Sequence, residues 1–198
     1  MSLRTLDIGA VIVTAFLAVR PLYASERRPD DPAVSAVHPI LAASLERLAS
    51  ESASWRDAMR AIAPTGRKAV VVTPDDVTGF DSQTLAQALA LADHESRVET
   101  VIVVVNLALL QRLSRLPVEA MQFKDDLDRI VAHEVFGHAV PYLLAGHLAG
   151  ECADPAAGQR VTDACAIKRE NQIRKELQLG RRLDYGRESL TLARRYER

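Results

Sequence analysis

Residues 123 to 139 read Phe-Lys-Asp-Asp-Leu-Asp-Arg-Ile-Val-Ala-His-Glu-Val-Phe-Gly-His-Ala, and the interpretation of the whole chain starts from this stretch. Its apolar residues recur at the spacing of one helix face, at Leu127, Ile130, Val131 and Val135. Acidic residues gather near its beginning, where a helix N-terminus favours negative charge. The stretch therefore predicts an amphipathic helix with its polar chemistry concentrated near the end.

Two histidines and a glutamate lie at that end, in the segment His-Glu-Val-Phe-Gly-His at 133–138. In zinc hydrolases a helical histidine pair holds the metal, and the glutamate beside the first histidine takes a proton from the attacking water. Histidines four residues apart lie about 40° apart around a helix, whereas five residues separate them by about 140°. We therefore expect one π-type widening between Glu134 and His138, with Gly137 lowering its steric cost. His133 and His138 are the predicted zinc ligands, and Glu134 is the predicted general base.

The composition is that of one globular domain spanning 1–198. The chain is 48% hydrophobic and 26% charged, with a net charge of −1, which gives no support for a nucleic-acid or anionic-membrane partner.

Residues 8–19 are nearly all apolar but too few for a bilayer-spanning helix, which needs about 20. Their β-branched side chains favour a strand within an N-terminal extension, 1–33, that ends in a loop. A signal peptide over 1–24 is the alternative. We expect the protein to be either cytoplasmic or exported without clear signal cleavage.

The remaining pattern predicts an α+β fold with a helical C-terminal half. The expected elements are a helix over 39–63 with a break at 50–54, a strand over 68–73, a helix over 81–93, a strand over 97–105, helices over 107–116 and 123–139, a loop over 149–160 and a helix over 162–179. The two strands are expected to form a small sheet beside the histidine-bearing helix, whose edge could hold an extended peptide by β-pairing.

One known family has the longer histidine spacing. Residues 133–138 resemble dipeptidyl peptidase III at every fixed position of its motif, His-Glu-x-x-Gly-His. The second motif of that family, Glu-Glu-x-Arg-Ala-Glu, is absent, and this chain is far shorter. The resemblance therefore supports the metal chemistry but does not imply dipeptidase specificity.

A second resemblance covers roughly the last third of the chain. Gly137-His138-Ala139 followed by Glu170-Asn171-Gln172-Ile173-Arg174 is similar to the order of motifs in bacterial effector and polymorphic-toxin metallopeptidase domains. It implies a zincin-type, gluzincin-like site in which Glu170 is the third zinc ligand, and a polypeptide substrate. Asn171 or Arg174 would orient that carboxylate. Taken alone, Glu170 and Arg174 favour the interpretation of a solvated ion pair one helical turn apart.

Other residues compete for the remaining roles. His147 is the second candidate for the third ligand and Asp163 is the third. Asp154, in the connecting loop, is a further carboxylate. Tyr185 is the preferred donor to the oxyanion of the transition state, and Tyr142 and Arg174 are the alternatives. Cys152 and Cys165 are either two idle thiols or one disulfide, which requires an oxidising compartment.

We expect a zinc-dependent metallopeptidase that hydrolyses peptide bonds through a metal-activated water. Two alternatives remain. In the first, the histidines and the glutamate belong to an ordinary core helix that binds no zinc. In the second, the chain is a non-catalytic protein-binding module derived from the zincin scaffold, which would bind zinc and function without Glu134.

Overall fold

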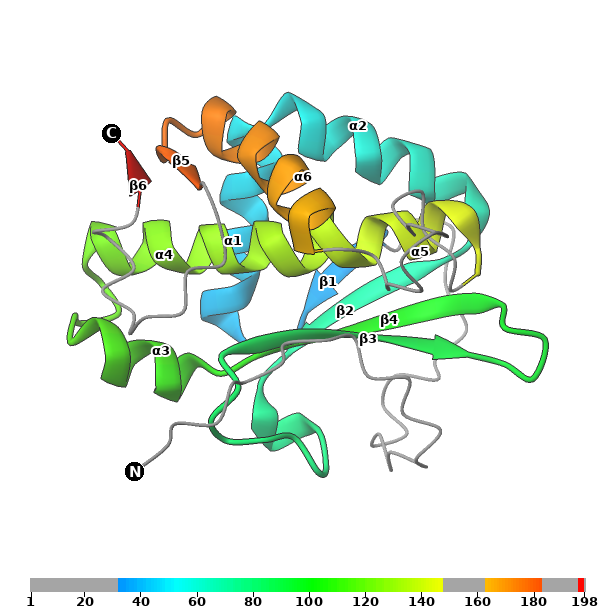
Figure 1. Ribbon diagram of the computed structural model, residues 1–198, viewed down its shortest axis with the longest axis horizontal. Helices are drawn as coiled ribbons and strands as arrows, with labels where there is room; N and C mark the ends of the chain where they lie inside the picture. The colour runs from blue at the N-terminus through cyan, green and yellow to red at the C-terminus, as the bar shows by residue number, and fades with distance from the viewer. Residues whose placement is uncertain (1–31, 148–162, 183–195, 198) are drawn as a thin grey trace.

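A computed structural model describes residues 32–147, 163–182 and 196–197. They form a mixed α+β fold in which the helices lie over one face of a four-stranded sheet (Figure 1). The predicted strand over 8–19, the alternative signal peptide over 1–24 and the loop over 149–160 lie outside these residues. Within the described ranges, no helix combines the length and apolar character needed to cross a bilayer.

The sheet has three parallel strands and one antiparallel edge strand. β1 (Val34–Ala36), β2 (Lys68–Val72) and β4 (Val98–Val105) run parallel, and β3 (Ala86–Ala92) pairs antiparallel with β4, which gives the order β1-β2-β4-β3. β2 and β4 confirm the two predicted strands to within one residue. Their β-branched side chains suit a sheet that is covered on both faces.

The prediction of a helix over 81–93 is wrong, because residues 86–92 form strand β3. Leucines in this alanine-rich stretch fall at helical spacing, which misled the pattern. In the structure the side chains alternate instead. Ala86 and Ala88 face the helical layer, whereas Leu89 faces the opposite side of the sheet. Pairing with β4 decides the conformation, since tertiary context overrides the helical preference of alanine.

The sheet separates two clusters of buried side chains. The larger cluster lies between the sheet and the helices and includes Val71 and Val103. The smaller one lies on the other face and consists of Val70, Val72, Val77, Leu89, Ile102 and Val104, with Phe80 packed against it. The segment between β2 and β3, which begins with the 3₁₀ helix Pro74–Asp76, therefore supplies the cover of that face.

Two helices connect β1 to β2, with a break between them as predicted. α1 (Pro39–Glu51) ends before Ser52, and α2 (Ala53–Ile62) begins after it. The Ser52 hydroxyl accepts a hydrogen bond from the Trp55 amide at 3.0 Å, so one side chain caps the new helix. A 3₁₀ turn over Ala63–Thr65 and Gly66, with φ of 76°, then lead into β2.

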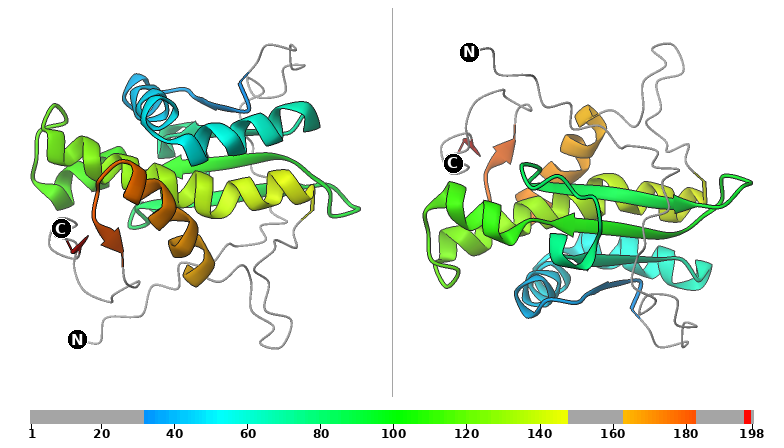
Figure 2. Two further views of the ribbon diagram at one scale, coloured as in Figure 1. Left: turned by 90° about the horizontal axis from the view of Figure 1, so that it is seen from above. Right: turned by 90° about the horizontal axis from the view of Figure 1, so that it is seen from below.

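After β4 the chain is helical. α3 (Leu107–Ser114) and α4 (Met121–Val131) are followed by a π-helical segment (Ala132–Ala139) and α5 (Val140–Ala145). α4, the π-helical segment and α5 form one continuous helix along the sheet (Figure 1). α6 (Asp163–Glu176) crosses over the π-helical segment (Figure 2), and the short strands β5 (Arg181–Arg182) and β6 (Tyr196–Glu197) pair beyond it.

A carboxylate near the end of α6 holds this helix against α2. Glu176 accepts hydrogen bonds from the Ser52 and Ser54 hydroxyls, both at 2.5 Å, and from the Ser54 amide at 3.2 Å.

Near the other end of α6, Cys165 is disulfide-bonded, so the interpretation of idle thiols is wrong for this residue. Cys152, the other cysteine of the chain, lies outside the described residues.

Asp128 joins α4 to α1 inside the protein. Its carboxylate accepts a hydrogen bond from the Ser44 hydroxyl at 2.5 Å and lies 2.9 Å from the Arg47 guanidinium. Burial outweighs both partners and raises the pKa of Asp128 to about 6. The folded state thus binds this proton more tightly than the unfolded chain, and stability is lost as the pH rises from about 4 through about 6.

The D128N variant should escape this loss. Its free energy of unfolding relative to the wild type should rise between pH 4 and pH 7, by about 3 kcal/mol at most, since one pKa unit corresponds to about 1.4 kcal/mol. Urea unfolding at both pH values measures the difference. Asp57→Asn, at an exposed carboxyl of α2, is the control. A difference for D128N that does not change with pH would contradict the expectation.

Candidate metal centre

The predicted widening of the helix is confirmed. Residues Ala132–Ala139 form a π-helical segment, which absorbs the additional residue between the two histidines. As a result His133 and His138 face each other with their ring centroids 4.9 Å apart and their planes at 84°. Their Nε2 atoms are 3.3 Å apart. A regular helix would have directed these side chains to different faces.

The separation of the two nitrogens fits a tetrahedral metal ion. With zinc–nitrogen bonds of about 2.05 Å, a nitrogen–nitrogen distance of 3.3 Å corresponds to an angle of about 107° at the metal. Burial, assisted by the nearby His133, lowers the pKa of His138 to about 3, so this imidazole stays neutral and keeps a lone pair. Two convergent imidazole nitrogens are a donor set that zinc binds readily.

Glu134 lies beside the pair on the sheet side. Its side chain is buried, and the backbone N–H of Ala88 on β3 donates to its carboxylate. Burial raises the pKa of Glu134, although His133 and this hydrogen bond oppose the shift. A carboxylate whose pKa is raised above its ordinary value is better suited to accept a proton and return it.

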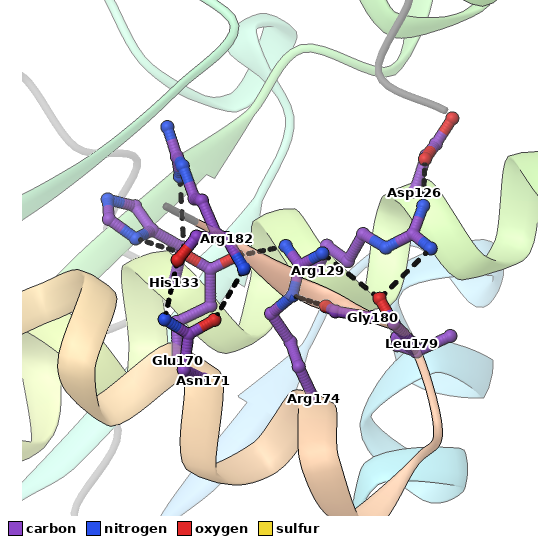
Figure 3. Close-up of polar contacts among 9 residues, drawn as sticks. All are labelled: Asp126, Arg129, His133, Glu170, Asn171, Arg174, Leu179, Gly180 and Arg182. Carbon is purple, nitrogen blue, oxygen red and sulfur yellow. Dashed lines mark hydrogen bonds and ion pairs between the residues drawn. The ribbon is translucent and has the colours of Figure 1, made fainter. Parts of the chain in front are cut away.

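Glu170 approaches His133 from α6 (Figure 3). Its Oε2 lies 3.0 Å from His133 Nδ1, whereas Oε1 accepts a hydrogen bond from Arg174 Nη1 at 2.7 Å. Arg182 Nη1 donates to Oε2 at 3.2 Å. Burial would raise the pKa of Glu170, but the hydrogen bond with His133 and the two arginines outweigh it and lower the pKa to about 2. The carboxylate is therefore ionised, almost fully buried and surrounded by donors.

The remaining residues of the Glu-Asn-x-x-Arg motif organise the chain that follows α6. The Asn171 side chain accepts from the Arg182 N–H and donates to the Arg182 carbonyl, both at 2.7 Å. Arg174 is completely buried, and its Nε and Nη2 donate to the carbonyls of Gly180 and Leu179 at 2.6 and 3.0 Å. These contacts return the chain so that Arg182 reaches Glu170 (Figure 3).

Gly137 permits the close contact between the π-helical segment and α6. A Cβ at this position would lie 3.0 Å from Ala166 Cβ and 3.1 Å from the Ala166 backbone. The glycine is therefore required for helix packing, and not only for tolerance of the widened turn. The next turn contains Pro141, which has no N–H to donate to the Gly137 carbonyl, and Arg169 of α6 donates to that carbonyl at 3.5 Å.

The structure separates the predicted site residues into two groups. It brings His133, Glu134, His138 and Glu170 together, with Arg174 directly on Glu170 and Asn171 acting on it through Arg182. Sequence reasoning missed Arg182, because no periodic pattern connects it with Glu170, twelve residues earlier. Whether Glu170 ligates a metal stays a prediction. Among the described residues, no group of three His, Cys, Asp or Glu side chains is arranged to hold a metal ion.

The alternative candidates lie elsewhere or outside the described residues. His147 is exposed and forms a β-bridge with Arg97, roughly 20 Å along the sheet from the Val103–Ala88 pair beside Glu134. Tyr142 is buried in α5. Asp163 begins α6, and its side chain is not described. Tyr185 and Asp154 lie outside the described residues, so their predicted roles stay predictions.

Comparison with known proteins adds no relative. No family model, no curated protein and no solved structure matches this chain.

The contact at Gly137 generates a prediction. G137A should lower the free energy of unfolding by about 1–3 kcal/mol, because an overpacked interface must shift α6 away from the π-helical segment. Denaturant unfolding measures the loss. A166G, which removes the nearest atom, should recover part of it in the double variant. Losses that simply add in a double-mutant cycle would show that this contact is not the cause.

Proposed function

We propose that the protein is a zinc-dependent metallopeptidase of zincin type. The observation that carries the proposal is the 3.3 Å approach of the His133 and His138 Nε2 atoms across the π-helical segment. A widened turn costs helix hydrogen bonding, and such turns occur disproportionately at functional sites. The small sheet packed on the histidine-bearing helix, with a helical C-terminal half, supports the zincin-like interpretation.

His133 and His138 would hold Zn²⁺ through Nε2, and the ion would supply Lewis-acid activation of water and of the scissile carbonyl. Glu134 takes a proton from the attacking water as the new carbon–oxygen bond forms. It then returns that proton to the leaving amine as the carbon–nitrogen bond breaks. The buried position of Glu134 supports both steps, because its raised pKa favours reversible proton transfer.

The position of β3 supports a polypeptide substrate. β3 lies at one edge of the sheet, and its Ala88 contacts the Glu134 carboxylate directly. An edge strand can pair with an extended peptide through main-chain hydrogen bonds. The alanines that face the helical layer from β3 keep this strand close to the histidine pair. A peptide aligned on β3 would therefore run past the proposed base.

The metal assignment predicts zinc in the purified protein. The wild type should contain one equivalent of zinc by elemental analysis, and H133A and H138A should each lose most of it, since each removes one of two converging donors. H94A changes an exposed histidine and should retain the metal. A wild type without stoichiometric zinc, or zinc kept by both variants, would sink the proposal and favour an ordinary core helix.

The role of Glu134 predicts a separation of binding from hydrolysis. E134Q should retain zinc and lose hydrolysis by at least a hundredfold, because general acid–base catalysis contributes about 10²–10⁴ in rate. Cleavage of a quenched fluorescent peptide library, compared between wild type and E134Q, measures the effect. E119Q, which changes an exposed glutamate in the turn between α3 and α4, serves as the control. Undiminished hydrolysis by E134Q would exclude it as the base, and a wild type that binds zinc without hydrolysis would favour the binding module.

A further inference from the structure

We propose that Glu170 is a positioning residue that acts through His133, in place of the direct zinc ligation that the resemblance implies. Its carboxylate holds a proton on His133 Nδ1, so that the Nε2 lone pair points towards His138. This inference rests on the proposed function, because it assigns a role within the same metal site. Two observations carry it. Glu170 contacts the Nδ1 atom of the His133 ring, and both oxygens of the Glu170 carboxylate accept hydrogen bonds.

The first observation is the position of Glu170 on the Nδ1 side of the ring. Arg174 and Arg182 donate to the two oxygens of Glu170, so the carboxylate is the acceptor in the 3.0 Å contact and the proton lies on His133 Nδ1. In a neutral imidazole with its proton on Nδ1, Nε2 carries the lone pair, and it is Nε2 that faces His138 at 3.3 Å. The two nitrogens of an imidazole point to opposite sides, which places Oε2 roughly 7 Å from a metal ion bound at Nε2. Glu170 cannot occupy both positions.

The second observation is that both oxygens of Glu170 already accept hydrogen bonds. Oε1 accepts from Arg174 at 2.7 Å, and Oε2 accepts from both His133 and Arg182. To reach the metal, Glu170 would have to leave Arg174, which is completely buried. Breaking this ion pair inside the protein would be strongly unfavourable, because it would leave a buried charge without its partner. The arrangement is therefore one in which the carboxylate is fixed where it stands.

The surrounding contacts explain why the carboxylate needs two arginines. Arg174 comes from the same helix as Glu170, and Arg182 is held by the two hydrogen bonds of its backbone to Asn171. A carboxylate that hydrogen-bonds a metal-binding histidine fixes its tautomer and its ring orientation. The Glu-Asn-x-x-Arg motif then has one purpose in all three polar positions: to keep one carboxylate against His133 Nδ1.

The tautomer can be read without any substitution. Long-range ¹H–¹⁵N spectra of the metal-free full-length protein should show His133 protonated at Nδ1, with a downfield proton that exchanges slowly because of the carboxylate. His94, which is exposed, provides the internal reference. Protonation of His133 at Nε2 instead would overturn the inference.

The role at the metal is tested with Co²⁺ as the probe. E170Q and E170D should keep the visible absorption spectrum of the Co²⁺-loaded wild type, while Co²⁺ affinity falls about 10–100-fold, as expected for a partner of a ligand and not for a ligand. E170D retains the charge and serves where E170Q folds poorly. E176Q, on the same helix but bonded to Ser52 and Ser54, is the matched control and should change neither readout.

The outcomes separate this inference from the proposed function. A changed Co²⁺ spectrum in E170Q or E170D would show that a donor to the metal was lost, and affinities equal to the wild type would show that Glu170 has no positioning role. Either result overturns the inference alone. A wild type that takes up neither Co²⁺ nor Zn²⁺ would overturn the metal site itself, and with it the proposed function.

Discussion

The widened turn over Ala132–Ala139 is the constraint on which the rest of the site depends. Five residues separate His133 from His138, and only a helix with a longer hydrogen-bonded ring can bring two such side chains to one side. The turn alone would be unstable, since it weakens the hydrogen bonding of its own helix. The turn is stabilised by two neighbouring elements that pack against it, the alanine face of β3 and the Ala166 region of α6.

Close approach on both sides is achieved with small side chains. Gly137 lets the backbone of α6 come within van der Waals distance of the π-helical segment, and Ala86 and Ala88 do the same for the sheet. His133 and Glu134 are both buried in this packing. Burial is what raises the pKa of Glu134 and keeps His138 neutral, so the electrostatics of the site follow from the size of its neighbours.

The negative charge of Glu170 inside the helical layer is stabilised by hydrogen-bond donors from the protein. Glu170 carries its charge in an almost dry environment because three donors, from His133, Arg174 and Arg182, converge on it. Arg174 in turn holds the turn at Leu179 and Gly180, which returns Arg182 to the site. Removing Arg174 would leave the buried charge of Glu170 without its closest partner, and the network as a whole extends from the end of α6 to His133 (Figure 3).

The sequence by itself determined the helix that bears the histidines, the need to widen it, strands β2 and β4 and the break at Ser52, because each depends on local periodicity or on the chemistry of neighbouring residues. Tertiary structure decided the rest. Strand β3 exists only because β4 offers it hydrogen bonds, and its alanines would otherwise favour a helix. The approach of Arg182, and the side of the His133 ring that Glu170 contacts, depend on how α6 crosses the π-helical segment. No local pattern encodes that crossing, since it is set by the fit between Gly137 and Ala166.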